Sequence, residues 1–391
     1  MIQSVDSLRN TFLGGTLRRG RISPLCRNRS SEPALHRMSP ASQITSNAFD
    51  SSARERLIAY LAQCRAGREG DVLALTPDAS TREYFRVPWK RKTAIAAVYP
   101  EPFDPEFHPF LDVTRLFTAA SLPVPEILDV DAPSGIILQE DLGDRQLRLV
   151  YESASEEDAD EYKERAVSLI AQIQAATPLA YELNSIASRL AFDEAKLAWE
   201  LSFFLEHYFG SLRGERLSHG TAAELKAELN DIAAELSERP RFLCHRDYHA
   251  SNLIVDSRDR LRIVDHQDAR MGPASYDLVS LLMDRQPEPP SLAEVRAHRL
   301  FFLDERRERG LDALDPDEFA REFRLMTVQR GLKAIGTFSY QTAVCGRGPT
   351  YAQFIRPTFL IVQQAAEWLG RFPALRRETA ARLDDEIIYE A

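Results

Sequence analysis

The densest group of reactive side chains lies in the stretch FLCHRDYHASNLIVDSRDRLRIVDHQDA, residues 242–269, which holds five Asp, three His and one Asn. Within it, Asp247, Asn252 and Asp265 are separated by five and by thirteen residues. Their carboxylate and amide oxygens are the ligands that Mg²⁺ prefers in proteins. A carboxylate beside a hydroxyl group can also orient that hydroxyl and accept its proton. These residue types therefore indicate a site for a hard cation, for proton transfer, or for both.

Short extended runs flank these residues and would position them. RFLCH (241–245) and LRIVDH (261–266) are apolar, and NLIVDSRDRL between them has the pattern of a hairpin that turns at DSRDR. The polar side chains would then lie at strand ends. A loop and the far end of a hairpin can bring Asp247, Asn252 and Asp265 to one point. The alternative is an ordinary hairpin with Asp and Asn in its turns.

The preceding part of the chain predicts a small antiparallel sheet. Five brief runs rich in apolar or β-branched residues are separated by turn-forming residues, at 71–76, 83–88, 93–99, 126–130 and 135–140. A helical pattern at 53–66 comes before them. Between the third and fourth runs, Phe110, Val113, Phe117 and Ala120 fall on one helical face, which predicts one helix packed on the sheet.

After residue 140 the hydrophobic period is that of helices, apart from the hairpin region. One helix is indicated by a stripe of apolar residues at Leu197, Leu201, Phe204, Leu205 and Tyr208. Further helices are expected at 160–176, 222–237, 275–285, 292–309, 316–343 and 350–370. The sequence therefore predicts an α+β fold in which a small sheet is followed by a mainly helical part.

The first fifty residues differ from the rest in composition. They hold seven Arg, only three acidic residues, many Ser and no sustained apolar period, which predicts a disordered extension. An organelle transit peptide, or an upstream start with Met38 as the true initiator, would fit the same composition.

Composition also limits the partners. A formal net charge of -10 and a pI near 5.5 provide no basic surface for a phosphate backbone, so no nucleic-acid partner is expected. No run approaches the roughly 20 apolar residues of a membrane helix, so no membrane partner is expected. The four Cys lie far apart without a CxxC pair, which is typical of a cytoplasmic protein rather than of a disulfide framework or a zinc site. We also expect a monomer.

The spacing HxDxxxxN in HRDYHASN, followed thirteen residues later by the Asp of VDHQDA, resembles the catalytic loop and metal-binding Asp of protein-kinase-like phosphotransferases. The wider frame HRDYHASNLIVD…IVDHQDARMGPASYDLVSLL is more similar to the aminoglycoside phosphotransferase and choline kinase family than to protein kinases. DASTREYFRV (78–87), ILQEDLGD (137–144) and QRGLKAIGTFSY (329–340) resemble its bacterial anomeric kinases of N-acetylmuramate and N-acetylglucosamine. The resemblance extends over residues 55–365.

This resemblance implies a protein-kinase-like bilobal fold. Beyond the extension at 1–50, we expect an antiparallel-sheet N-lobe at 51–140 and a mainly helical C-lobe with the catalytic loop at 141–391. The implied function is an ATP- and Mg²⁺-dependent kinase that phosphorylates the anomeric hydroxyl of N-acetylmuramate or N-acetylglucosamine in cell-wall sugar recycling. An aminoglycoside or choline-type acceptor is the second possibility, and an inactive nucleotide-binding scaffold is the third.

The resemblance also assigns roles within the loop. Asp247 matches the catalytic base, and Asn252 and Asp265 match the Mg²⁺ ligands. His245 would brace the loop by hydrogen bonding, and Asp277 would tie down its backbone. The polar candidates for acceptor contacts are Arg246, His249, Gln267 and Arg330, with Asp268 as an ambiguous neighbour.

A zinc site at His249 and His266 is an alternative, although the oxygen ligands already account for this stretch.

The nucleotide site departs from the usual kinase pattern. The turn PDASTRE has no Gly, so Ser80, Thr81 and Arg82 would hold the phosphates unless this is a plain hairpin turn. TAIAAVYPE lacks the Lys that many kinases carry in the third strand, and Arg82 or Arg86 would have to substitute for it. Main-chain groups would face the adenine edge at Gln139, Glu140, Asp141 and Leu142, which leaves ATP and GTP undistinguished.

Overall fold

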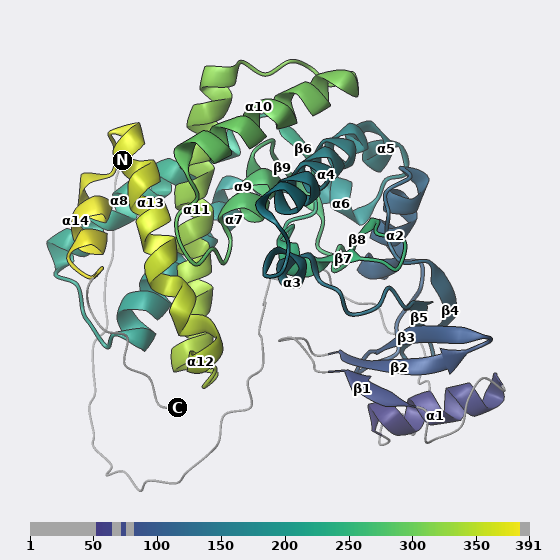
Figure 1. Cartoon of the computed structure of the whole chain (residues 1–391). Coiled ribbons are helices and arrows are strands. Elements are labelled where there is room, and N and C mark those ends of the chain that lie inside the picture. Colours follow the sequence, from purple (N-terminus) through teal and green to yellow (C-terminus); the bar gives the residue numbers. More distant parts are fainter. Residues whose placement is uncertain (1–51, 65–71, 76–81, 384–391) are drawn as a thin grey trace, which may run out of the picture. The chain divides into compact units, whose positions relative to one another are not determined.

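The computed structural model describes residues 52–64, 72–75 and 82–383 (Figure 1). The predicted disordered extension at 1–50 lies outside the described residues, and so do Ser80 and Thr81. Among the helices of the described ranges, none has the length and apolar composition needed to cross a membrane.

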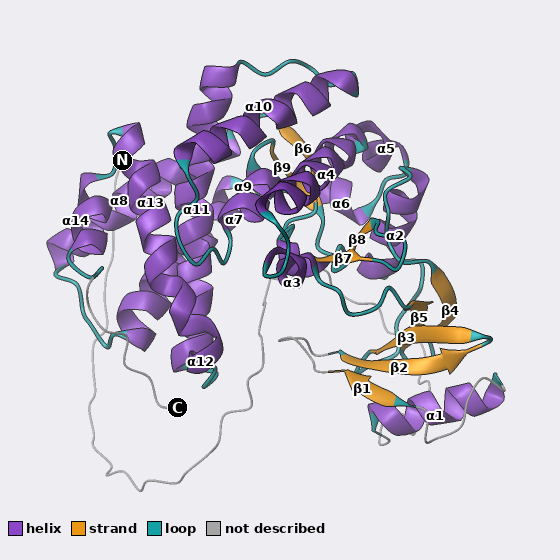
Figure 2. Ribbon diagram, viewed as in Figure 1, coloured by secondary structure: helices purple, strands orange, loops and turns teal. Residues whose placement is uncertain are grey.

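The predicted five-stranded antiparallel sheet is confirmed. Its strand order is β1-β2-β3-β5-β4, and every pair of neighbours is antiparallel (Figure 2). The strands are β1 (Leu73–Leu75), β2 (Glu83–Trp89), β3 (Lys92–Val98), β4 (Ile127–Asp131) and β5 (Ile136–Glu140). The predicted N-lobe boundary at residue 140 coincides with the end of β5 but stays a prediction.

Helix α1 (Ala53–Gln63) supplies the apolar cover for one face of this sheet. It begins at Ser52 with a capping box, in which Ser52 and Glu55 satisfy each other's main-chain N–H groups. Its Leu57 and Leu61 share a hydrophobic core with residues of β2, β3 and β5.

Helix α2 (Pro109–Ala119) differs from the prediction that it packs on the sheet. Its buried Val113, Leu116 and Phe117 belong instead to the large core of the helical part. The predicted apolar face is correct as a pattern, but periodicity alone cannot say which partner covers it.

The remainder of the chain is mainly helical, as predicted (Figure 2). Its longest helix is α11 (Pro316–Ala343), which is buried along most of its length. The other helices are α3 (Leu147–Tyr151), α4 (Glu156–Ala175), α5 (Thr177–Glu182), α6 (Ile186–Arg189), α7 (Glu194–Phe204), α8 (His219–Ser237), α9 (Tyr276–Met283), α10 (Leu292–Glu308), α12 (Gly348–Tyr351), α13 (Ile355–Leu369) and α14 (Pro373–Ala380), with short 3₁₀ turns at Ala250–Asn252 and Ala352–Phe354.

The predicted stripe on α7 is altered at its end, because the helix continues as a π-helix at Leu205–Leu212. Leu205 is therefore only partly buried, whereas the successive residues His207, Tyr208 and Phe209 are all buried. The wider π-helical turn rotates the side chains away from the α-helical period that the stripe assumed.

Four short strands frame the reactive stretch. β7 (Leu253–Val255) and β8 (Leu261–Ile263) form the predicted hairpin. β6 (Arg241–Cys244) pairs instead with β9 (Arg270–Pro273), a strand that the sequence pattern did not reveal. These two pairs fix the ends of the loop between β6 and β7 and of the segment between β8 and β9.

Candidate active site

The loop after β6 is held by one buried carboxylate. Asp277, on α9, accepts hydrogen bonds from the main-chain N–H groups of His245 at 2.6 Å and Arg246 at 3.0 Å. The predicted tie between Asp277 and the loop backbone is confirmed. These bonds support an unusual backbone, since Arg246 has a φ of 87° and Asp265, across the site, has a φ of 63°. Such strained positions concentrate at functional sites.

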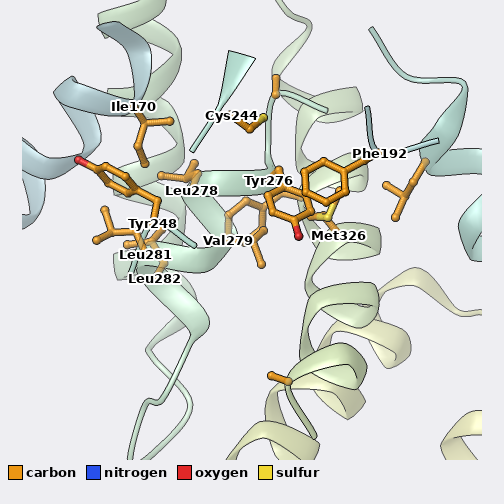
Figure 3. Packing of buried hydrophobic residues seen from close by; sticks show 14 of the residues in the cluster. Ile170, Phe192, Cys244, Tyr248, Tyr276, Leu278, Val279, Leu281, Leu282 and Met326 are labelled. Atoms are coloured by element: carbon orange, nitrogen blue, oxygen red, sulfur yellow. The ribbon is translucent and has the colours of Figure 1, made fainter. Parts of the chain in front are cut away.

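Two large aromatic side chains, one on the loop and one on α9, anchor this region in the main core. Tyr248 and Tyr276 are both completely buried in the main core, close-packed among residues such as Leu278 and Val279 (Figure 3). The ring of Tyr276 stacks on that of Phe192 at 3.9 Å, and the Tyr248 hydroxyl donates to the carbonyl of Ala166 at 3.0 Å.

His245 and His266 face this packed interior. His245 donates from Nε2 to the Val264 carbonyl at 3.0 Å, which joins the loop to the segment after β8. His266 Nε2 lies 2.7 Å from Thr114 Oγ1 of α2, and burial lowers the pKa of His266 to about 3. Thr114 therefore engages Nε2 of His266, whereas Nδ1 has no hydrogen-bond partner in the described part of the chain.

The carboxylate of Asp247, the predicted base, is partly buried between two cations. Lys333 Nζ of α11 lies 3.3 Å from Asp247 Oδ1, and Arg246 Nε lies 3.6 Å from Oδ2. Burial would raise the pKa of Asp247, but the positive charges of Lys333, Arg246 and Arg330 outweigh it and hold the pKa well below its usual range. Asp247 is therefore ionised at neutral pH.

Asn252 and Asp265, the predicted metal ligands, lie together. Asn252 Nδ2 donates to the main-chain carbonyl of Asp247 at 2.9 Å and lies 3.5 Å from Asp265 Oδ2. With its amide nitrogen engaged there, the side-chain carbonyl oxygen of Asn252 remains as an acceptor. Asn252 thus contacts both Asp247 and Asp265, which brings the three residues together, and their role as metal ligands stays a prediction.

The surroundings of Asp265 favour a positive ligand. Burial raises the pKa of its carboxyl despite the hydrogen bond from Gln267, and the negative charge of Asp247 raises it further. Gln267 Nε2 donates to Asp265 Oδ1 at 2.8 Å, and Arg82 Nη2 lies 3.7 Å from the same oxygen. A hard cation bound by oxygen ligands would offset both the burial and the repulsion.

The predicted acceptor contacts differ in their positions. Arg330 is only 2% exposed and donates to the carbonyl of Arg246, to Ser280 and to Asp284. It therefore supports the loop from the protein interior. Gln267 is bonded to Asp265.

Arg246 forms a 3.0 Å ion pair with Asp268, the residue whose role the sequence left ambiguous. His249 is partly exposed, and burial of its ring followed by the charge of Arg285 lowers its pKa to about 4. Arg246 and His249 therefore remain the better placed of the four for an acceptor.

The segment 139–142, which is predicted to face the adenine edge and is here called the hinge, forms ion pairs with two arginines. Arg262, on β8, is nearly buried and lies 2.6 Å from Glu140 Oε2 while donating to the Val124 carbonyl at 2.9 Å. Arg86, on β2, lies 2.7 Å from Asp141 Oδ2 and makes a second 2.7 Å ion pair with Asp144. The side chains of Glu140 and Asp141 are thus engaged within the protein.

The two candidate substitutes for the missing strand Lys are therefore distinct. Arg86 is committed to the hinge carboxylates, whereas Arg82 lies next to Asp265, with Tyr84 and Tyr99 rings within 6 Å of its guanidinium carbon. Arg82 is the better placed to meet a phosphate near Asp265.

Two charged residues of the site were not found from the sequence. Lys333 and Arg262 contact Asp247 and Glu140 from segments 86 and 122 residues away. A signal exists for Lys333, because it stands in GLKAIG between residues that are otherwise apolar or small. A lone Lys on such a helix has to find a charge partner.

Comparison with known proteins agrees with the family resemblance of the sequence. Residues 71–311, more than half of the chain, match the model of the phosphotransferase enzyme family. An N-acetylmuramate/N-acetylglucosamine kinase of Pseudomonas aeruginosa is 32% identical over 275 residues, which cover 69% of this chain and 76% of that protein.

Solved structures share the fold at low identity. A choline kinase of Streptococcus pneumoniae has a TM-score of 0.51 and 13% identity, covering 82% of this chain and all of that one. The ADP-bound aminoglycoside phosphotransferase APH(2'')-Ib has a TM-score of 0.50 and 14% identity, covering 80% of this chain and 98% of the other.

The α+β, protein-kinase-like fold predicted from the sequence is confirmed by these comparisons, as is the resemblance to aminoglycoside phosphotransferases and choline kinases. The matched segment includes the loop, the hairpin and Asp265. The chain belongs to the phosphotransferase enzyme family.

Proposed function

We propose that this enzyme transfers the γ-phosphoryl group of ATP to the anomeric hydroxyl of N-acetylmuramate or N-acetylglucosamine. The names of its relatives support this acceptor class, and the ADP-bound family structure supports a nucleotide donor. The reaction would serve cell-wall sugar recycling in the cytoplasm, where ATP is supplied. We expect the enzyme to act as a monomer.

One observation carries the choice of acceptor, namely the two cations beside Asp247. Lys333 and Arg246 place positive charge where the acceptor must bind, which disfavours cationic acceptors such as choline and aminoglycosides. They also hold the pKa of Asp247 low, so its carboxylate is a weak base. An anomeric hydroxyl is more acidic than an ordinary alcohol and asks less of such a base.

In the proposed step, Asp247 orients the acceptor hydroxyl and receives its proton. A bond forms between the acceptor oxygen and the γ-phosphorus while the bond from that phosphorus to the β-phosphate oxygen breaks, and its electron pair leaves with ADP. Arg330 and Asp277 hold the loop so that the carboxylate faces the hydroxyl. His245 has the role of a brace.

Asn252 and Asp265 would hold Mg²⁺, which neutralises charge on the nucleotide phosphates. Their fit rests on the oxygen ligands and on the carboxylate of Asp265, whose pKa is raised by desolvation and by the negative charge of Asp247. Gln267 orients that carboxylate, and Arg82 would contact a phosphate beside it. At the hinge, main-chain groups from Gln139 to Leu142 would bind the adenine edge.

A panel of acceptors tests the proposal. N-acetylmuramate, N-acetylglucosamine, kanamycin and choline are each supplied with ATP and Mg²⁺, ADP release is measured, and phosphorus NMR locates the product phosphate. We expect turnover with the two N-acetylated sugars and phosphate on C1. Phosphate on C6, or turnover with kanamycin or choline alone, would reject the proposal. If the protein binds ATP but turns over none of these acceptors, the result would favour the alternative of an inactive nucleotide-binding scaffold.

A further inference from the structure

Lys333 presents a charged group to the site from the middle of α11. The residues around it, Leu332, Ala334 and Ile335, are buried, and its own side chain is 22% exposed. Its ammonium nitrogen lies 3.3 Å from Asp247 Oδ1. A Lys in such a position is desolvated and needs charge partners.

Its hydrogen-bonding capacity exceeds what the described part of the chain offers. An ammonium group has three N–H donors, and Asp247 is the acceptor within reach among the described residues. The carboxylate of Asp247 is moreover shared with Arg246. By contrast Arg330, one helical turn earlier, is nearly inaccessible, and both of its terminal nitrogens donate within the protein, to Arg246, Ser280 and Asp284.

The position of the ammonium relative to the reaction follows from the carboxylate. An acceptor hydroxyl must approach Asp247 to about 3 Å for its proton to be transferred. The phosphoryl group meets that same hydroxyl oxygen. The ammonium and the acceptor oxygen would therefore both lie within hydrogen-bond distance of one carboxylate, which makes the ammonium a near neighbour of the transferred group. A second N–H of Lys333 can therefore point at a phosphoryl oxygen.

We propose that Lys333 is a catalytic residue whose ammonium donates a hydrogen bond to the phosphoryl group during transfer. This role rests on the proposed function, because it requires that Asp247 is the residue that accepts the proton of the acceptor hydroxyl. Lys333 stays protonated throughout, while the acceptor proton passes to Asp247 and the bonding pair leaves with ADP. Its charge offsets the negative charge spread over the phosphoryl oxygens.

A different role is to bind the carboxylate of N-acetylmuramate. That carboxylate is attached through carbon 3 of the sugar, whereas Lys333 contacts the residue that meets carbon 1. N-acetylglucosamine lacks the carboxylate, so the two sugars separate the two roles.

The test compares Lys333→Met with wild type on both sugars. Lys226→Met, at an exposed position on α8, is the matched control. We expect kcat of Lys333→Met to fall about 100- to 1000-fold on both sugars, as for the loss of one transition-state donor. KM should stay within about threefold, and Lys226→Met should match wild type. ADP affinity, measured by calorimetry, should also stay close to wild type, because ADP lacks the transferred group.

Two further variants guard against a folding defect. Lys333→Arg keeps the charge and should recover part of kcat, and methylammonium should raise the rate of Lys333→Ala. An unchanged kcat in Lys333→Met, or a loss confined to N-acetylmuramate through KM, would overturn the proposal. Failure of charge rescue in both further variants would overturn it as well.

A failure of the role proposed for Lys333 can be distinguished from a failure of the proposed function. If wild type phosphorylates neither sugar, the function fails, and the Lys333 variants are then measured with whichever acceptor wild type uses. With no acceptor found, slow hydrolysis of ATP by water supplies the rate. Lys333→Met should lower that rate by a similar factor, and an equal rate would reject the role of Lys333.

Discussion

Asp277 on α9 accepts a 2.6 Å hydrogen bond from the main-chain N–H of His245, which lies 32 residues earlier in the chain. The same carboxylate accepts from the next N–H, that of Arg246, where the backbone has a positive φ. A single buried side chain thus holds the loop in a conformation that the loop residues would not adopt by themselves.

Replacing Asp277 by Ala should destabilise the protein and lower kcat together. Two buried N–H groups would lose their acceptor, at a cost of about 1–3 kcal/mol each. Urea unfolding measures the loss, and Asp277→Asn, which keeps one acceptor oxygen, should lose less. An Ala variant as stable as wild type would show that the loop is held by other contacts.

Asp247→Asn should nearly abolish turnover while leaving nucleotide affinity unchanged. The base acts on the acceptor, and its loss typically costs about 10²- to 10⁴-fold in rate. Calorimetry with ADP and steady-state kinetics separate the two effects. An equal loss of ADP affinity in the folded variant would contradict the role assigned to Asp247.

Asp265→Ala should weaken Mg²⁺-dependent nucleotide binding and rate together, because it removes a charged ligand of the proposed cation. Calorimetric titration of ADP with Mg²⁺ and with EDTA measures the difference. Wild type and variant should bind ADP equally in EDTA. Restoration of activity by Zn²⁺ but not by raised Mg²⁺ would count against an oxygen-ligand site.

Gly336→Ala should destabilise the helix that carries Lys333. A Cβ at Gly336 would lie 2.9 Å from main-chain atoms of Phe204, which cannot move without shifting the neighbouring helix. Overpacking of this kind costs about 1–3 kcal/mol, and thermal unfolding would reveal it.

Gly331→Ala provides the contrast, because its Cβ would lie 2.4 Å from a side-chain methyl of Val362. Adding Val362→Ala should relieve that clash, while Gly336→Ala should not respond to the same change. A response of both variants to Val362→Ala would show that the two clashes are coupled.

Stability should fall between pH 6.5 and pH 4 in part through His108. Burial and then the charge of Arg82 lower the pKa of His108 to about 4. In this pH range the unfolded chain therefore binds a proton at His108, whereas the folded protein does not. The contribution of His108 to the free energy of unfolding is fully present above pH 6.5 and is lost as the pH falls toward 4. The slope from one such group is at most about 1.4 kcal/mol per pH unit.

His108→Phe should flatten this dependence, since Phe keeps a ring against Tyr99 and Phe103 but cannot ionise. Urea unfolding at several pH values measures the slope. His219→Phe, at an exposed position, should leave it unchanged. An identical slope in the His108 variant and wild type would contradict the prediction.

The sequence by itself determined the elements whose signals are local. The strands of the sheet and the β7–β8 hairpin follow from alternation and turn residues, which report on neighbouring positions. The proximity of Asp247, Asn252 and Asp265 in space also follows from the sequence, because one short loop and one hairpin join them. The assignment of Asp277 depended on family resemblance, since no local pattern links it to the loop.

Tertiary structure decided everything that depends on segments distant in the chain. It brought Lys333 to Asp247 and Arg262 to Glu140, placed α2 on the large core, and paired β6 with an unexpected strand. Periodicity tells which face of an element is apolar but not what covers it. Partner choice is settled by close packing of the whole core and by the need of each buried charge for a counter-charge.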